Sequence, residues 1–462
     1  MSLSRRAACV LLLGLYSVFT VDAQSIINET ALLVQEAIYL PKPDTAQCIA
    51  RFGSVSPISV LMVADDGTFS GTSEAVYLIQ TLKGQLKAPV NSVPCQQFYT
   101  GYLLGQKVVL AISGIGPEAA ALCTTYITQC AELVKDFIYV GTSGWSAQQG
   151  GILNAPSSCA AANGPTTRNR LGDVAITPFS VNWQCKLASW TEQCTNFPNV
   201  CTYPIEEAGP VVQSLYGKCV FSHRTKANTD LSDELIAATK TSQFAANALQ
   251  LQASFNSTNL AYETAYWSAT TAGSGNVYPP FPAYTRPNIL DYTQAAELDA
   301  QFFFEGTPYE MVARNYTAVT LNLANNSTLT QYDVTGTHFC SLPASDASTL
   351  FSRCNRILSG RYQSVNGEEG VGVSAALDLF NSLAGVPKIK YTFVRANSDY
   401  IYSPVVQVSP GVWEDSPQTP AANFETSYLF AIQSASTVVL TTFQLRCLAA
   451  GNSANACAFS IV

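Results

Sequence analysis

The chain has 462 residues, of which 47% are hydrophobic and 12% are charged, and its formal net charge is −8. This length is enough for a large hydrophobic core or for two domains. A nucleic-acid-binding face would need clustered lysines and arginines, and the sequence has no such cluster. The composition therefore predicts a globular protein with a sparsely charged surface and no nucleic-acid partner.

The N-terminus has the pattern of a secretory signal peptide. Arg5 and Arg6 precede the apolar run AACVLLLGLYSVFT, and small residues follow at 21–23. The apolar run is too short to cross a bilayer comfortably. We expect residues 1–23 to be removed, so that a secreted mature chain starts at Gln24. An uncleaved anchor helix is the alternative.

No later stretch of the sequence is apolar for long enough to cross a membrane. The nearest candidate, 428–445, carries Gln, Ser and Thr throughout, so we predict an amphipathic core helix there. The mature chain is therefore expected to have no integral membrane span.

The cysteines agree with export. Fourteen occur, and thirteen remain after the signal peptide, which contains Cys9. In an oxidising compartment, disulfides are the expected state of such cysteines. Two pairs have the spacing of short disulfide loops: Cys340/Cys354 and Cys447/Cys457. An odd number leaves at least one free thiol, and the candidates are Cys123 and Cys130, which are seven apart on a predicted helix.

Five Asn-x-Ser/Thr sequons predict a glycosylated surface on a secreted chain: Asn28, Asn256, Asn315, Asn325 and Asn326. A zinc site is the alternative use of the cysteines. The sequence has two histidines and no Cys-x-x-Cys, so we expect no metal.

Strands and helices alternate along the chain. Short apolar runs predict strands at 57–64, 107–112, 137–140, 173–177 and 390–395, and helical spacing predicts helices at 117–135, 373–385 and 423–448. This alternation indicates an α/β fold with a single mixed, largely parallel sheet flanked by helices.

Three stretches rich in Cys, Asn, Pro or Ser interrupt this pattern, near 145–170, 180–222 and 256–345. Their hydrophobic periods are too broken for an independent core. We therefore expect one domain over 24–462, with these stretches as insertions on a shared scaffold.

A glycine turn follows the second predicted strand. Gly114, Gly116 and Ala119 fit the Gly-x-Gly-x-x-Gly/Ala fingerprint of dinucleotide-binding folds, and Asp136 lies twenty residues beyond Gly116. Such folds place the fingerprint after their first strand, however, and here another strand precedes it. A second glycine-rich strand end also follows at 141–144.

This turn is the first of four segments whose order is informative. They are FYTGYLLGQKVVLAISGIGPEAAA (98–121), FIYVGTSG (137–144), LGDVAITPF (171–179) and FVRANSDY (393–400). In this order they resemble the purine nucleoside phosphorylase and nucleosidase superfamily, to which plant bark storage proteins and secreted fungal purine nucleoside permease-like proteins are also similar. The resemblance covers about half of the chain, and each segment alone is a weak signal.

The resemblance implies a site that cleaves purine nucleosides. Asp399 would donate a proton to N7 of the leaving purine, with its pKa raised by burial and with Ser398 orienting it. The family's ribose-binding Glu falls in NGEEGVGVSAAL, where its usual Met is absent. Glu368 and Glu369 compete for this role, and spacing to Arg395 favours Glu369.

Other residues would bind the nucleophile. The turn at Gly114 and Gly116 brings backbone N–H groups and a helix N-terminus toward an anion or a water. The hydroxyl and N–H groups at Thr142, Ser143 and Gly144 could fix the same group. Asp65 and Asp66 end the first strand, where nucleosidases keep a carboxylate that activates water, and the sequence does not distinguish between them.

One departure bears on the reaction. Phosphorylases of this group tend to carry an Arg that clamps phosphate where this chain has Tyr139. We therefore expect hydrolysis over phosphorolysis, with a purine nucleoside as partner and no cofactor apart from phosphate as a possible co-substrate. A homo-oligomer is expected. The alternative function is a non-catalytic storage protein or a nucleoside-binding or uptake protein on the same fold.

Overall fold

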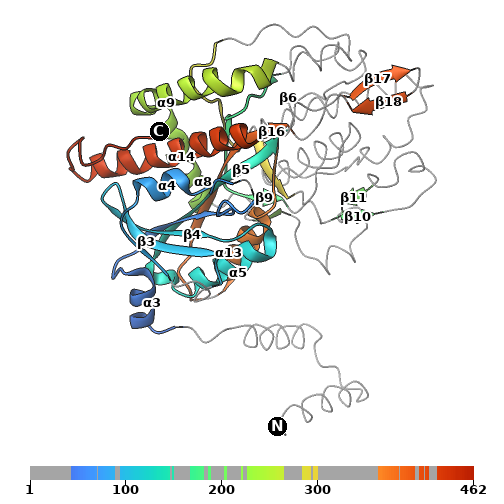
Figure 1. Cartoon of the computed structure of the whole chain (residues 1–462). Helices are drawn as coiled ribbons and strands as arrows, with labels where there is room; N and C mark the ends of the chain where they lie inside the picture. The colour runs from blue at the N-terminus through green and yellow to red at the C-terminus, as the bar shows by residue number, and fades with distance from the viewer. Residues whose placement is uncertain are drawn as a thin grey trace, which may run out of the picture. The chain divides into compact units, whose positions relative to one another are not determined.

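Four buried runs form the parallel centre of the sheet in the computed structural model (Figure 1). β1 (Ile58–Val63), β4 (Gln106–Ile112), β5 (Val134–Trp145) and β16 (Lys390–Tyr400) pair in the order β4–β1–β5–β16. All six residues of β1 are buried, as expected for a strand covered on both faces. The C-terminal ends of these four strands therefore meet at one edge of the sheet.

The structure describes sixteen stretches of the chain, and the site lies among them. They are 43–69, 71–88, 94–145, 148–149, 167–181, 186–188, 202–204, 220–221, 226–264, 283–292, 295–299, 363–383, 385–400, 405–409, 412–415 and 424–461. The predicted signal peptide and the Cys340/Cys354 pair lie outside these residues.

Antiparallel strands extend the sheet on both sides. β3 (Gln97–Leu103) joins β4, and β2 (Lys83–Lys87) joins β3. On the other side, β8 (Val174–Thr177) runs antiparallel to β16, and β15 (Gln363–Gly367) runs antiparallel to the end of β5. Twelve described strands join one sheet, which confirms the predicted α/β class with a mixed sheet.

The remaining strands are short. β13 (Ile289–Leu290) pairs with β8, and β14 (Ala295–Asp299) lies between β15 and β9 (Ser180–Val181), which pairs with β12 (Val220–Phe221). Six further described strands form three separate two-stranded sheets. These are β6 (Gln148–Gln149) with β7 (Thr167–Arg168), β10 (Lys186–Ala188) with β11 (Thr202–Pro204), and β17 (Val405–Ser409) with β18 (Val412–Asp415). β13 and β14 fall within 256–345, so part of that predicted insertion belongs to the sheet.

Helices cover the two faces of the sheet (Figure 1). α5 (Pro117–Thr128) and α13 (Gly370–Ser382) pack on the face that includes Val60 and Met62. α8 (Lys226–Thr239), α9 (Ser242–Ser254) and α14 (Phe424–Ala449) pack on the face that includes Leu61 and Val63. Because successive residues of a strand point to opposite faces, β1 contributes to both cores.

Two short helices and two irregular turns are also described. α3 (Thr45–Phe52) contributes Phe52 to the α5 side, and α4 (Val76–Thr81) contacts α14. A 3₁₀ turn spans Ala131–Leu133, and a π-helical turn at Phe255–Asn259 continues α9.

The long helix α14 is not amphipathic, in contrast to the prediction. Residues 430–444 are buried without interruption, because the sheet lies on one side of the helix and α8 and α9 contact it as well. Three of its buried hydroxyls, those of Ser434, Thr437 and Thr442, donate to carbonyl oxygens one turn back. No helix in the described part of the chain combines the length and apolarity needed to cross a bilayer.

α5 is shorter than predicted. It ends at Thr128, and β5 begins at Val134 instead of Phe137. Four β-branched residues follow one another closely at the end of the helix, and such residues lower helix propensity: Thr124, Thr125, Ile127 and Thr128.

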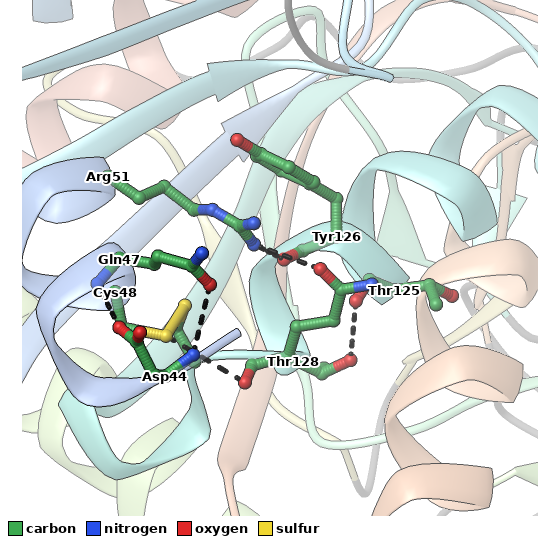
Figure 2. Close-up of a disulfide and its surroundings, with 9 residues drawn as sticks. Asp44, Gln47, Cys48, Arg51, Thr125, Tyr126 and Thr128 are labelled. Atoms are coloured by element: carbon green, nitrogen blue, oxygen red, sulfur yellow. Dashed lines mark hydrogen bonds between the residues drawn. A yellow bond between two sulfur atoms is a disulfide. The ribbon is translucent and has the colours of Figure 1, made fainter. Parts of the chain in front are cut away.

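Disulfides attach α5 and the turn that follows it, so the free-thiol interpretation of Cys123 and Cys130 is wrong. Cys130 bonds to Cys48 across 82 positions, and Cys123 bonds to Cys95. Figure 2 shows the surroundings of Cys48, where Arg51 donates to the carbonyl oxygen of Tyr126 at 2.7 Å. The expected pair Cys447–Cys457 is also a disulfide. The disulfides Cys48–Cys130 and Cys95–Cys123 close longer stretches of chain, so the spacing of cysteines in the sequence could not predict them.

Candidate active site

Three buried carboxylates gather around one buried arginine at the C-terminal ends of the central strands. The arginine is Arg395 on β16, and the carboxylates are Glu74, Glu297 and Glu369, which we call the carboxylate cluster. Each of the four side chains belongs to a residue that is at most 5% exposed. Burial of this much charge is costly unless every group is paired, so the bonds within the cluster determine what it can do.

Glu369 is bonded from three elements. Its Oε1 accepts from the Gly116 N–H at 3.3 Å, and its Oε2 accepts from the Tyr139 hydroxyl at 3.0 Å and from Arg395 Nη2 at 3.1 Å. Gly116 has φ 98° and caps α5, and this left-handed conformation favours glycine. The carboxylate thus lies at a helix N-terminus, where negative charge is stabilised.

This contact explains the glycine turn. Among the described residues, the anion that meets the Gly116 N–H is the chain's own Glu369. Asp136, the ribose-binding acid of a dinucleotide fold, lies instead at the opposite end of β5 and pairs with Arg446 at 3.0 Å. The fingerprint therefore does not form a dinucleotide site here.

Arg395 uses every nitrogen of its guanidinium. Nε and Nη2 donate to Glu297 Oε1 at 3.1 and 2.7 Å, Nη2 also reaches Glu369, and Nη1 donates to the Thr142 carbonyl oxygen at 3.1 Å. Its Cζ lies 4.3 Å from the centre of the Tyr139 ring. Arg395 therefore links the carboxylates to the end of β5.

Glu74 is a site residue that the sequence did not indicate. It immediately precedes Ala75, the N-cap of α4. Its Oε2 accepts from the N–H groups of Ala64 and Asp65, and its Oε1 accepts from the Thr142 N–H at 2.7 Å and the Thr142 hydroxyl at 3.0 Å. Burial, and then the nearby Glu369, raise the pKa of Glu74, although Arg395 opposes this. A single Glu before a helix is too common to be a sequence signal.

Asp65 and Asp66 shape a loop. Asp65 Oδ1 accepts from the N–H groups of Gly67 and Phe69, and Asp66 Oδ1 accepts from the N–H of Thr68. These are the local bonds that aspartates make in turns. The carboxylate that lies in the cluster is Glu74, and the role of Asp65 or Asp66 in activating water stays a prediction.

Asp399 lies at the end of β16, opposite Gly144 of β5. Its Oδ1 accepts a hydrogen bond of 2.6 Å from the hydroxyl of Ser398, the neighbour expected to orient it. Burial raises the pKa of Asp399, and the bond from Ser398 opposes this. Among the described residues, Oδ2 of Asp399 accepts no hydrogen bond. A carboxyl in this state retains a proton to higher pH than a solvated aspartate does.

The other predicted residues on β5 lie beside the cluster. Thr142 directs both its N–H and its hydroxyl to Glu74. Ser143 is buried, and its carbonyl oxygen accepts from the Ser398 hydroxyl at 3.2 Å. Gly144 pairs with Asn366 of β15 as well as with Asp399. These three residues therefore connect the carboxylate cluster to Asp399 along one strand.

Glu368, the other candidate for binding the ribose, differs from Glu369 in its exposure and its contacts. Burial, and then Glu369, raise its pKa to about 7, and Arg395 opposes this. Glu369 has the contacts expected of a fixed hydroxyl acceptor, whereas Glu368 remains partly exposed. Among the described residues, no group of three or more His, Cys, Asp or Glu side chains could hold a metal ion.

A second buried group fixes the strand end that carries Asp399. Asn397 exchanges backbone bonds with Gly172 and Asp173. The Tyr400 hydroxyl donates to Glu263 at 2.8 Å, and the Leu171 N–H donates to the same oxygen at 2.6 Å. The segment 171–173 thus serves to position β16.

Replacing Glu263 by Gln should stabilise the protein at pH 8 and have little effect at pH 5. Burial raises the pKa of Glu263 from 4.5 to about 7. Because the folded state then binds the proton more tightly than the unfolded state, stability is lost as pH rises from about 4.5 to 7. This difference corresponds to roughly 3 kcal/mol, and Gln avoids it while still accepting both bonds.

Chemical denaturation of both proteins at the two pH values measures this effect. Glu234→Gln is the matched control, because the bonds from Arg446 lower the pKa of Glu234, and its loss should destabilise the protein at pH 8. Equal stability differences for Glu263→Gln at pH 5 and pH 8 would show that Glu263 is ionised in the folded state.

Comparison with known proteins gives structural likeness alone. No known family model matches the sequence, and no curated protein matches it. Among solved structures, the 5′-methylthioadenosine/S-adenosylhomocysteine nucleosidase of Neisseria meningitidis, in complex with methylthio-immucillin-A, is 10% identical with a TM-score of 0.40, covering 84% of this chain and 97% of that one. The chain is similar to this nucleosidase.

Two further structures show the same level of similarity. The Streptococcus pneumoniae MTA/SAH nucleosidase in complex with 8-aminoadenine is 12% identical with a TM-score of 0.39, covering 83% of this chain and 98% of that one. The futalosine hydrolase of Helicobacter pylori is 9% identical with a TM-score of 0.39, covering 84% of this chain and 97% of that one. At these values the likeness assigns no activity to the chain.

Proposed function

We propose that the chain hydrolyses the N-glycosidic bond of purine nucleosides. The observation that carries this proposal is a pair of carboxyl groups of different character, one on β16 and one after β15, which both pair with the end of β5. Asp399 has a raised pKa and a free oxygen, whereas Glu369 is held by Arg395, Tyr139 and Gly116. Pairs of carboxyl groups in contrasting environments are typical of acid-assisted glycosidic cleavage. The four sequence segments support the same chemistry.

Asp399 is the proposed general acid. When the bond between the sugar C1′ and the purine breaks, its electron pair moves to the base. The proton of Asp399 is transferred to N7 of the purine as this charge develops, and the leaving base departs neutral. Because Oδ1 accepts from Ser398, Oδ2 is the oxygen that would carry the proton.

Glu369 is the proposed ligand of the ribose. A carboxylate accepts hydrogen bonds from two adjacent hydroxyls, and its charge stabilises an oxocarbenium-like sugar. Arg395 and Tyr139 fix the orientation of its Oε2, so the group needs little reorganisation when substrate binds.

Glu74 is the proposed acceptor of the water proton. Because burial raises its pKa, Glu74 is a stronger base than a solvated glutamate. Each carboxylate oxygen of Glu74 already accepts two hydrogen bonds. Three of the four donors are backbone N–H groups, and only the Thr142 hydroxyl can rotate away to admit a water. The water oxygen would bond to C1′ while its proton passes to Glu74.

Phosphorolysis is disfavoured by the charges of the cluster. Tyr139 occupies the position of the phosphate-clamping arginine, and the guanidinium of Arg395 is already bonded to Glu297, Glu369 and Thr142. Any ionised carboxylate among Glu74, Glu297 and Glu369 would also repel a phosphate dianion at this position. Water is neutral and is not excluded in this way.

When the protein is incubated with inosine, adenosine or guanosine, each nucleoside should release free base at the same rate with phosphate as without it. The expected sugar product is ribose in both cases, because water attacks C1′. Chromatography of base and sugar measures both. Formation of ribose 1-phosphate with a many-fold faster rate in phosphate would show that the reaction is phosphorolysis.

The same incubation tests the alternative function. The absent Met beside Glu369 and the missing arginine favour a storage or uptake protein that binds nucleosides without cleaving them. Binding of nucleosides with no release of base would support that alternative. We further propose that the chain is exported, which the three disulfides of the described residues support.

A further inference from the structure

Glu297 is the member of the carboxylate cluster to which the proposed reaction gives no task. It lies on β14, where it pairs with Val365 of β15 and is 1% exposed. Its Oε1 accepts from both Nε and Nη2 of Arg395, at 3.1 and 2.7 Å. Such a charge-assisted contact is strong and directional, so Glu297 determines where the Nε–Nη2 edge of the guanidinium lies.

The second oxygen of Glu297 is unusual for a structural ion pair. Oε2 is buried and has no hydrogen-bond partner among the described residues. An unpaired buried carboxylate oxygen is costly. A pair that served stability alone would be expected to bond both oxygens, as Glu234 does with Arg446 at the opposite end of the sheet.

Two glycines make room for this pair. A Cβ at Gly370 would lie 1.9 Å from Glu297 Oε1, and a Cβ at Gly367 would lie 2.5 Å from Arg395 Nη2. Both distances are far below normal contact, so any side chain at either position would displace the pair. The backbone on both sides of Glu369 is therefore shaped around Glu297 and Arg395.

The Glu297–Arg395 pair is connected to Glu369, the residue proposed to bind the ribose. Nη2 of Arg395 is shared between Glu297 Oε1 and Glu369 Oε2. With its Nε–Nη2 edge fixed by Glu297, the guanidinium presents Nη2 to Glu369 and Nη1 to the Thr142 carbonyl oxygen. Displacing Arg395 would leave Glu369 with the Tyr139 hydroxyl and the Gly116 N–H alone.

We propose that Glu297 is a positioning residue, which acts through Arg395 to hold Glu369 in the orientation that accepts the ribose hydroxyls. This inference rests on the proposed function. It adds a charged residue from β14 that contacts neither the substrate nor the reacting atoms.

Replacing Glu297 by Gln tests the role of its charge. Gln keeps the shape and an acceptor for Arg395 but removes one negative charge from a group that contains Arg395, Glu369, Glu74, Glu368 and Tyr139. The remaining carboxyls ionise more easily when one neighbouring charge is removed. We expect the acid limb of kcat/KM to move to lower pH by about one unit, and kcat/KM on the plateau to fall by roughly tenfold.

Replacing Glu297 by Asp tests the role of its geometry. Asp keeps the charge but is one methylene shorter, so the bonds to Arg395 lengthen. We expect kcat/KM to fall with KM rising, while the acid limb stays where it is in the wild type. This second variant also provides a readout if Glu297→Gln does not fold.

Glu234→Gln is the matched control, because it neutralises a carboxylate that bonds an arginine at the other end of the sheet. Its pH profile should match that of the wild type. Wild-type cleavage with unchanged profiles and kcat/KM in both Glu297 variants would overturn this inference alone. A wild type that cleaves no nucleoside would overturn the proposed function, and this inference with it.

Discussion

Replacing Asp399 by Asn is expected to lower kcat for nucleoside cleavage by about 10²–10⁴-fold, or about 3–5 kcal/mol in the barrier, in a protein that still folds. The two side chains are nearly isosteric, and the amide oxygen can still accept from Ser398. An amide N–H can donate a hydrogen bond to N7 in the bound substrate. It cannot transfer a proton as the base leaves, so kcat falls more than substrate affinity does.

Steady-state kinetics with inosine and adenosine measure this effect. Asp136→Asn is the matched control, because Asp136 is a buried aspartate at the opposite end of β5, and its kcat should equal that of the wild type. If Asp399→Asn keeps kcat within a factor of about three while remaining folded, Asp399 serves only the local structure at the end of β16 and the assignment of the general acid fails.

Replacing Arg395 by Met should destabilise the protein by about 3–5 kcal/mol at pH 8, because it leaves buried carboxylates without their cation. Burial already raises the pKa values of Glu74 and Glu297, and Arg395 opposes this. Without Arg395 these carboxyls would bind protons more tightly when folded than when unfolded. The loss of stability should therefore be smaller at pH 5 and grow as pH rises.

Urea denaturation at pH 5 and pH 8 measures both expectations. Lys226→Met is the control, because Lys226 forms an exposed ion pair with Asp230, and such pairs contribute little. A variant at Arg395 that is as stable as the wild type at pH 8 would show that the carboxylates of the cluster find other partners.

Part of the site was predictable from short segments. The resemblance to the nucleosidase superfamily, carried by segments such as Arg-Ala-Asn-Ser-Asp, pointed to Asp399 and Ser398, and the same resemblance with the spacing to Arg395 pointed to Glu369. These residues are local to a strand end or a helix start, where sequence patterns are informative. Glu74 and Glu297 have no such pattern, whereas Asp65 and Asp66 were candidates because they lie at the end of the first strand.

The sequence by itself determined the α/β class, the presence and approximate positions of the central strands and of α13 and α14, and the Cys447–Cys457 pair, because apolar runs, helical spacing and short cysteine loops are local. The ends of β5 and α13 differ from the predicted ends by three to five residues. Only the tertiary structure decided which N–H meets which carboxylate. Gly116 and Glu369 are 253 positions apart, and Arg395 and Glu297 are 98 apart. Local patterns carry no information about such pairs, which form when parallel strands bring their C-terminal ends together and bury the charges that lie there.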